Sequence, residues 1–89
     1  MSLQRPTPAD FLQRPTPADF LLREVYRVAA HAEYARLAST AGNGVWLERT
    51  RRQQSTLVTV RSVALASGVA LQLVDAAEQR GRAFFSGSN

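Results

Sequence analysis

Apolar residues recur at intervals of three and four from residue 17 to about residue 41, which is the spacing of one face of an α-helix. A second, weaker apolar line runs through Tyr26, Ala30 and Leu37. A helix with two apolar lines is usually buried on two sides or forms part of a dimer. We therefore predict one long N-terminal helix, whose main stripe consists of Leu21, Leu22, Val25, Val28, Ala29, Ala32 and Ala35.

The start of this helix carries capping signals. Thr16 can act as the N-cap, Pro17 follows where a missing N–H costs nothing, and Asp19 lies at the capping-box position. The residues 42–44, Gly-Asn-Gly, favour the end of the helix because they accept positive φ angles.

The same nine-residue segment, LQRPTPADF, occurs at residues 3–11 and again at residues 12–20. This period is far shorter than the roughly 20 to 50 residues of solenoid repeats, and its perfect identity indicates a recent or cloning-derived duplication. Pro15 would break a helix begun in the first copy. We expect residues 1–16 to form a flexible leader, residues 17–85 a single small domain, and residues 86–89 a flexible tail.

The second half of the chain allows two interpretations. In the first, a basic connection leads to a helical region over roughly residues 62–80, because alanine there favours helix. In the second, the β-branched segment 55–60 and the alternating segment 69–74 form strands, and residues 82–85 add another. We prefer the helical interpretation and a mainly α fold class, with a short β-hairpin or wing as an option; whether residues 55–75 are helix or strand stays open.

Residues 63–74 read VALASGVALQLV, which resembles the helix-turn-helix of LacI-type bacterial repressors, V-A-x-x-A-G-V-S-x-x-T-V. In such a motif Thr59 would cap the first helix, Val63 and Ala64 would face inward, and Gly68 would supply a positive-φ turn. A second helix over residues 70–80 would pack back through two apolar anchors, Val74 and Ala77.

The resemblance covers about residues 59–80 and implies binding to duplex DNA. The sequence departs from the pattern at Ala70 and Leu73, where LacI-type repressors carry hydroxyl residues. On the recognition face, Gln72 and Gln79 are natural readers of base edges, whereas Asp75 would repel phosphate.

The densest charge cluster includes Arg49, Arg51 and Arg52, and Trp46 comes just before it. Guanidinium groups beside an aromatic ring could hold a nucleic-acid backbone and stack a base. The alternative is a solvated connection in which Trp46 anchors the core and the arginines face water. If the protein binds an anion, these arginines are the first residues to test.

The net charge is +4, and all eleven basic residues are arginines. Arginine pairs with phosphate in a bidentate manner, so nucleic acid is a plausible partner, although such a charge also serves solubility. The longest apolar stretch, residues 63–74, is far shorter than the roughly 20 residues that span a bilayer. We expect no membrane contact and a cytoplasmic location.

Motifs of enzyme and cofactor chemistry are missing from the sequence. It contains no cysteine, no lysine, no nucleophile elbow and no glycine-rich phosphate loop. The sole histidine, His31, has Arg27 and Ala35 four residues away on either side instead of metal ligands. We therefore predict no catalytic residue, no cofactor and no metal, and a solvated His31.

Two functions are consistent with these observations. The first is a non-enzymatic helical protein–protein interaction or assembly module that pairs with itself or another protein. The second is a helix-turn-helix transcriptional regulator that binds DNA through Arg49, Arg51, Arg52, Gln72 and Gln79. We rank the first ahead, because base-reading residues are few. A homodimer interface is expected at the second apolar line, which contains Tyr26, Ala30 and Leu37.

Overall fold

The computed structural model describes residues 16–40 and 44–85. They form three helices, α2 (Pro17–Ser39), α3 (Gly44–Ala66) and α4 (Leu71–Ala83). Of the described residues, 88% are helical and none lies in a strand, so the predicted mainly α class is confirmed. The expectations for residues 1–15, for residues 41–43 of the helix stop and for the tail 86–89 lie outside the described residues.

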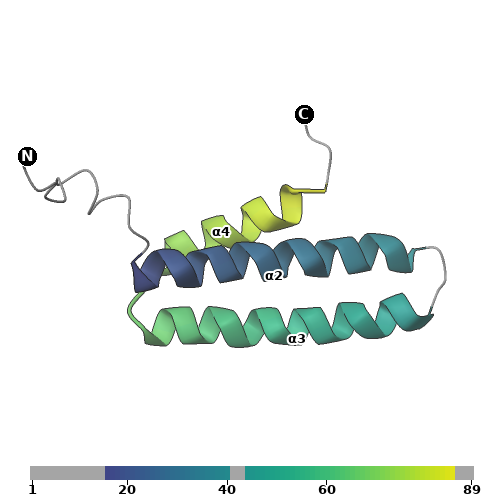
Figure 1. Ribbon diagram of the computed structural model, residues 1–89, viewed down its shortest axis with the longest axis horizontal. Helices are drawn as coiled ribbons and strands as arrows, with labels where there is room; N and C mark the ends of the chain where they lie inside the picture. Colours follow the sequence, from purple (N-terminus) through teal and green to yellow (C-terminus); the bar gives the residue numbers. More distant parts are fainter. Residues whose placement is uncertain (1–15, 41–43, 86–89) are drawn as a thin grey trace, which may run out of the picture.

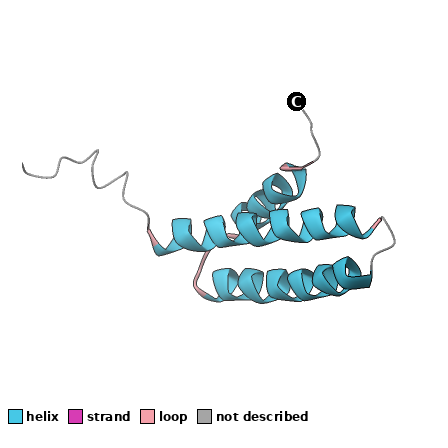
Figure 2. Cartoon of the chain, turned by 45° about the vertical axis from the view of Figure 1, so that its right-hand side comes forward, coloured by secondary structure: helices cyan, strands magenta, loops and turns pink. Residues whose placement is uncertain are grey.

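The chain runs along α2, reverses along α3 and reverses again in α4 (Figure 1). Helix α2 packs against both other helices, whereas α3 and α4 contact each other far less. Figure 2 shows that α4 crosses α2 obliquely. Helix α2 is thus the central element, and it buries apolar residues on two sides, against α3 and against α4.

Helix α2 begins with the capping box that its sequence predicts. The Asp19 backbone N–H donates to the Thr16 hydroxyl oxygen at 3.1 Å, and the Thr16 N–H donates to the Asp19 carboxylate at 3.2 Å. Pro17 occupies the first turn, where its missing N–H has no helical partner to lose. The two reciprocal bonds satisfy donors that a helix start leaves open.

The buried core consists of small side chains. Alanine and valine make up all of it except Leu57, and the largest side chains that are fully buried are Val25 and Val74. Small residues let the helix axes approach closely, but they bury little apolar area. The buried hydrophobic residues in the described part of the chain are Val25, Val28, Ala29, Ala30, Ala32, Ala35, Leu57, Ala64, Val69, Val74 and Ala77, and Gly81 is buried beside them.

Two sequence interpretations of the region before residue 66 are wrong. Residues 48–52, expected as a connection, and residues 55–60, considered as a strand, both lie inside α3. Leu57, Val60 and Ala64 recur at helical spacing and pack on the core, and this tertiary contact overrides the β propensity of the segment. Thr59 caps no helix: like the other α3 threonines, it donates its hydroxyl to the carbonyl four residues earlier, Ser55, at 3.2 Å.

The turn between α3 and α4 is a Schellman motif. Gly68 has a φ of +93°, its N–H donates to the Leu65 carbonyl at 3.0 Å, and the Val69 N–H donates to the Ala64 carbonyl at 3.0 Å. Val69 and Ala64 are both buried, which supplies the apolar contact of the motif. Gly68 therefore makes the turn that the sequence predicts, and it does so in the left-handed region that glycine tolerates.

The two ends of α4 differ from the expected pattern. At its start, Ala70 offers no side-chain cap, as its departure from the LacI-type pattern implies. At its end, residues 82–85 form no strand or wing: the helix continues to Ala83, and the Phe84 N–H donates to the Gly81 carbonyl at 3.2 Å. The β-hairpin option is wrong here because these residues still pack against α2, where Phe84 meets Tyr26.

Candidate functional site

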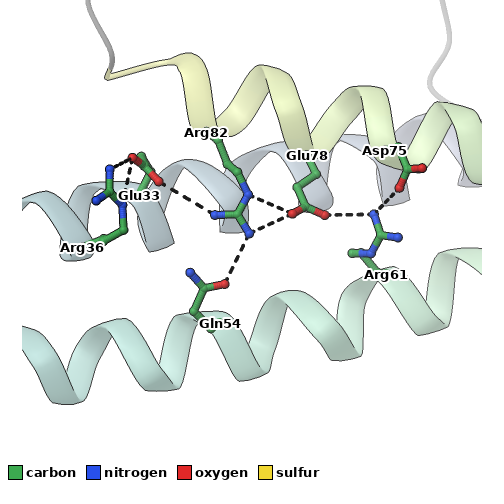
Figure 3. Close-up of polar contacts among 7 residues, drawn as sticks. All are labelled: Glu33, Arg36, Gln54, Arg61, Asp75, Glu78 and Arg82. Atoms are coloured by element: carbon green, nitrogen blue, oxygen red, sulfur yellow. Dashed lines mark hydrogen bonds and ion pairs between the residues drawn. The ribbon is translucent and has the colours of Figure 1, made fainter.

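A polar cluster joins the three helices (Figure 3). Arg61 of α3 donates to the Asp75 and Glu78 carboxylates of α4 at 2.8 and 2.9 Å. Arg82 of α4 donates to Glu78 at 2.9 Å and lies 3.8 Å from Glu33 of α2. The cluster comprises Glu33, Arg36, Gln54, Arg61, Asp75, Glu78 and Arg82.

Each carboxylate of this polar cluster is engaged by a guanidinium group. Hydrogen bonding from Arg36, with the charge of Arg82 nearby, holds the pKa of Glu33 below its usual value against a smaller opposing effect of burial. Within residues 16–40 and 44–85, no three acidic or histidine side chains gather as metal ligands would. The arrangement thus positions α4 on α2 and α3. The Asp75–Glu78 pair was not among the predicted site residues, although its i, i+3 spacing places both carboxylates on one helix face.

The residues predicted to contact DNA are divided between two regions. Arg49, Arg51 and Arg52 lie on the first half of α3, and Arg52 precedes the end of that helix at Ala66 by about 21 Å at the usual helical rise. Helix α4 begins at the other end of α3 (Figure 1), and Gln72 is the second residue of α4. The structure therefore separates Gln72 from the arginines.

The outer face of α4 presents the two glutamines. Gln72 and Gln79 are exposed, whereas Val74 and Ala77 are fully buried as the helix-turn-helix pattern predicts. Ala64 also faces inward, but Val63 is exposed, contrary to the expectation for it. Asp75 pairs with Arg61, so part of its negative charge is compensated.

Aromatic rings cluster where α4 ends. Tyr34 packs edge-on against Trp46 at a centroid distance of 5.5 Å, and Phe85 lies 5.4 Å from Tyr34. The Arg49 guanidinium stands 4.8 Å from the centroid of the Trp46 ring. Trp46 is thus half-buried beside α2 in a helix, neither a deep core anchor nor part of a loop.

Most of the predicted dimer line is covered within the chain. Gly81 of α4 lies so close to α2 that a Cβ atom there would reach the Ala30 backbone nitrogen at 3.1 Å, and Ala30 is buried. Tyr26 is half-buried and packs edge-on against Phe84, with ring centroids 6.1 Å apart. Leu37, farther along the same line, is exposed because α4 ends before reaching it.

No family model matches this sequence, and no curated protein or solved structure is significantly similar to it. In the part of the chain that the structure describes, no helix is long and apolar enough to cross a bilayer.

Beyond the end of α4, the faces of α2 and α3 that it covers earlier along the two helices are left open. On α3, Arg61 and Gln54 contact residues of α4, and Leu47 lies seven residues before Gln54 on the same face. On α2, Leu37 follows Ala30 by seven residues in the same way. Both leucines are exposed, 40% for Leu37 and 47% for Leu47. We call the last turns of α2 and the first turns of α3 the hairpin tip, with Leu37 and Leu47 as its apolar pair.

Proposed function

We propose that this protein is a non-enzymatic helical assembly module that acts in the cytoplasm as a homodimer. The observation that carries this proposal is the distribution of apolar side chains: the buried core is alanine and valine with one leucine, while twelve apolar side chains, nine of them larger than valine, are exposed. A core of this kind gives marginal stability in so short a chain, and association adds to it. The exposed set is Phe20, Tyr34, Leu37, Val45, Leu47, Val58, Val63, Leu65, Leu71, Leu73, Phe84 and Phe85.

The hairpin tip is the part of this surface that best fits a second copy. Leu37 and Leu47 lie on the faces of α2 and α3 that α4 covers farther along, and they are exposed because α4 ends before it reaches them. Two tips related by a two-fold axis cover each other's leucines, because one self-complementary patch is sufficient. The resulting contact is a four-helix arrangement of two α2–α3 hairpins.

Two ion pairs neutralise part of the charge around the tip. Glu48 and Arg51 lie 3.7 Å apart on α3, and Glu33 bonds to Arg36 on α2. These two pairs reduce the charge that each copy brings to the contact, whereas Arg49 and Arg52 of the same turns of α3 form no ion pair within the described residues.

A charge placed on the tip should separate the dimer. Leu47→Glu buries a carboxylate in the apolar contact and should give a monomer by light scattering coupled to gel filtration, with the helical circular dichroism spectrum retained. Leu37→Glu, which places the charge on α2, should also give a monomer that keeps its helical spectrum.

Val63→Glu is the matched control. Val63 lies on the same helix with the same exposure as Leu47, 47%, but roughly 160° away around the axis. It should leave the dimer intact. A wild-type protein that is monomeric at millimolar concentration, or a Leu47→Glu variant that stays dimeric, contradicts the proposal.

Binding to duplex DNA through a helix-turn-helix is the second candidate. It is favoured by the Schellman turn at Gly68, by the inward anchors Val74 and Ala77, and by the outward Gln72 and Gln79. Such binding should weaken steeply with salt and should lose affinity when the three arginines at 49, 51 and 52 are replaced by alanine. The absence of any gel retardation of duplex DNA at low salt rejects it.

A further inference from the structure

A small pocket opens between α2 and α3 beside the aromatic cluster. Its volume is about 260 Å³, and its lining consists of His31, Tyr34, Ala35, Trp46, Arg49 and Gln53. We propose that this pocket binds a small aromatic carboxylate, with the ring against the aromatic side chains and the carboxylate on Arg49. The inference does not rest on the dimer, although the pocket shares Arg49 with the residues considered for DNA binding, and Trp46 is the neighbour of Leu47 on α3.

The walls of the pocket suit a flat apolar group. Tyr34 and Trp46 meet edge-on at an interplanar angle of 78°, which forms an aromatic corner, and buried Ala35 leaves room beside it. Rings add favourable contact when they pack at such offset or perpendicular angles. An aliphatic ligand of the same size gains less from these walls.

The polar side of the pocket is cationic. Arg49 holds its guanidinium over Trp46 and forms no ion pair with any residue of the described ranges, while its neighbour Glu48 pairs with Arg51. No carboxylate lines the pocket, and the lining also includes the Gln53 amide and the His31 imidazole. A carboxylate can therefore form a charge-assisted contact with Arg49 without displacing an internal partner.

The volume restricts the ligand to about one ring and one acidic group. We take benzoate as the probe and expect a Kd on the order of 1 mM, since so few heavy atoms in an open pocket bind weakly. Benzamide has the same shape without the charge, and cyclohexanecarboxylate has the charge without the aromatic ring. Both should bind at least several-fold more weakly.

The readout is built into the chain, because Trp46 is its sole tryptophan. Benzoate should change the fluorescence of Trp46 in a saturable manner, and amide resonances of the pocket residues should shift along the same curve. Arg49→Gln should weaken benzoate roughly tenfold or more through loss of the charged pair. The matched control is Arg51→Gln. Arg51 is also exposed on α3 but lies outside the pocket, so this variant should bind benzoate as the wild type does.

Three results overturn the inference: no saturation up to tens of millimolar, equal affinity for benzoate and benzamide, or an Arg49→Gln variant that binds benzoate unchanged. The benzamide comparison uses the wild-type protein, so it decides the matter even if a variant folds poorly. A failed dimer test leaves these results intact, because the pocket is formed within one chain and the comparison of benzoate with benzamide can be made on a monomer.

Discussion

Gly81 lies at a close approach of α4 to α2, and a single methyl group there should loosen the fold. In Gly81→Ala the new Cβ atom would lie 2.8 Å from the Ala29 Cβ and would overlap the carbonyl oxygen of Tyr26. Both obstacles belong to the backbone or to a Cβ atom, so no flexible side chain can swing aside. Helix α4 must therefore move away from α2.

The magnitude follows from two opposing effects. Overpacking a closely packed contact costs about 1–3 kcal/mol, and the clash at Gly81 involves several atoms, which places it in the upper part of that range. Replacing glycine by alanine inside a helix returns up to about 1 kcal/mol. The free energy of unfolding should thus fall by about 1–2 kcal/mol, which corresponds to a decrease in Tm of roughly 5–15 °C for a domain of this size.

Thermal unfolding followed by circular dichroism measures this change. Gly44→Ala is the control, because a Cβ atom at Gly44 meets nothing within 4 Å; its Tm should stay the same or rise slightly. If Gly81→Ala proves as stable as the wild type or more so, the close packing of α4 on α2 described above is incorrect.

Two further changes test the local chemistry. Thr16→Ala removes one half of the capping box and should lower the unfolding free energy by about 1 kcal/mol, measured by urea unfolding; an unchanged midpoint would contradict the role of the cap. The pKa of Glu33 is lowered chiefly by Arg36, so the stabilising effect of this carboxylate is present at neutral pH and is lost as the pH falls from about 5 through the lowered pKa. Glu33→Gln should therefore lose less stability between pH 7 and pH 3 than the wild type in the same urea assay, and an equal loss would show that another carboxylate controls the acid response.

The sequence predicts those features of the fold that depend on local rules. The capping box at Thr16 and the turn at Gly68 follow from residue types at fixed spacings, and the structure has both. Helix α3 could not be read in this way, because its first half is polar and its threonines favour strands. Helix α3 is stabilised by Leu57, which packs against core residues of α2. The apolar periodicity of one segment does not reveal a packing partner elsewhere in the chain.

The candidate surfaces depend on how far each helix extends. The sequence identifies Tyr26, Ala30 and Leu37 as one line, but only the length of α4 decides that the first two are covered and the third is exposed. The pocket was missed for a similar reason. Its residues come from two helices, and the arginine cluster was expected in a connection, where Arg49 would not stand over Trp46 beside Tyr34.

The central position of α2 has a consequence for the order in which the molecule opens. Helix α4 packs on α2 and contacts α3 mainly through the polar cluster, so α4 can detach while the α2–α3 hairpin stays folded. Helix α2 cannot unfold while α3 and α4 stay in place, because both of them pack on it. Backbone amides of α4 should therefore exchange with solvent through a subglobal opening that begins at Gly68, and those of α2 only through global unfolding. The Schellman turn is then the boundary between two cooperative units of one small domain.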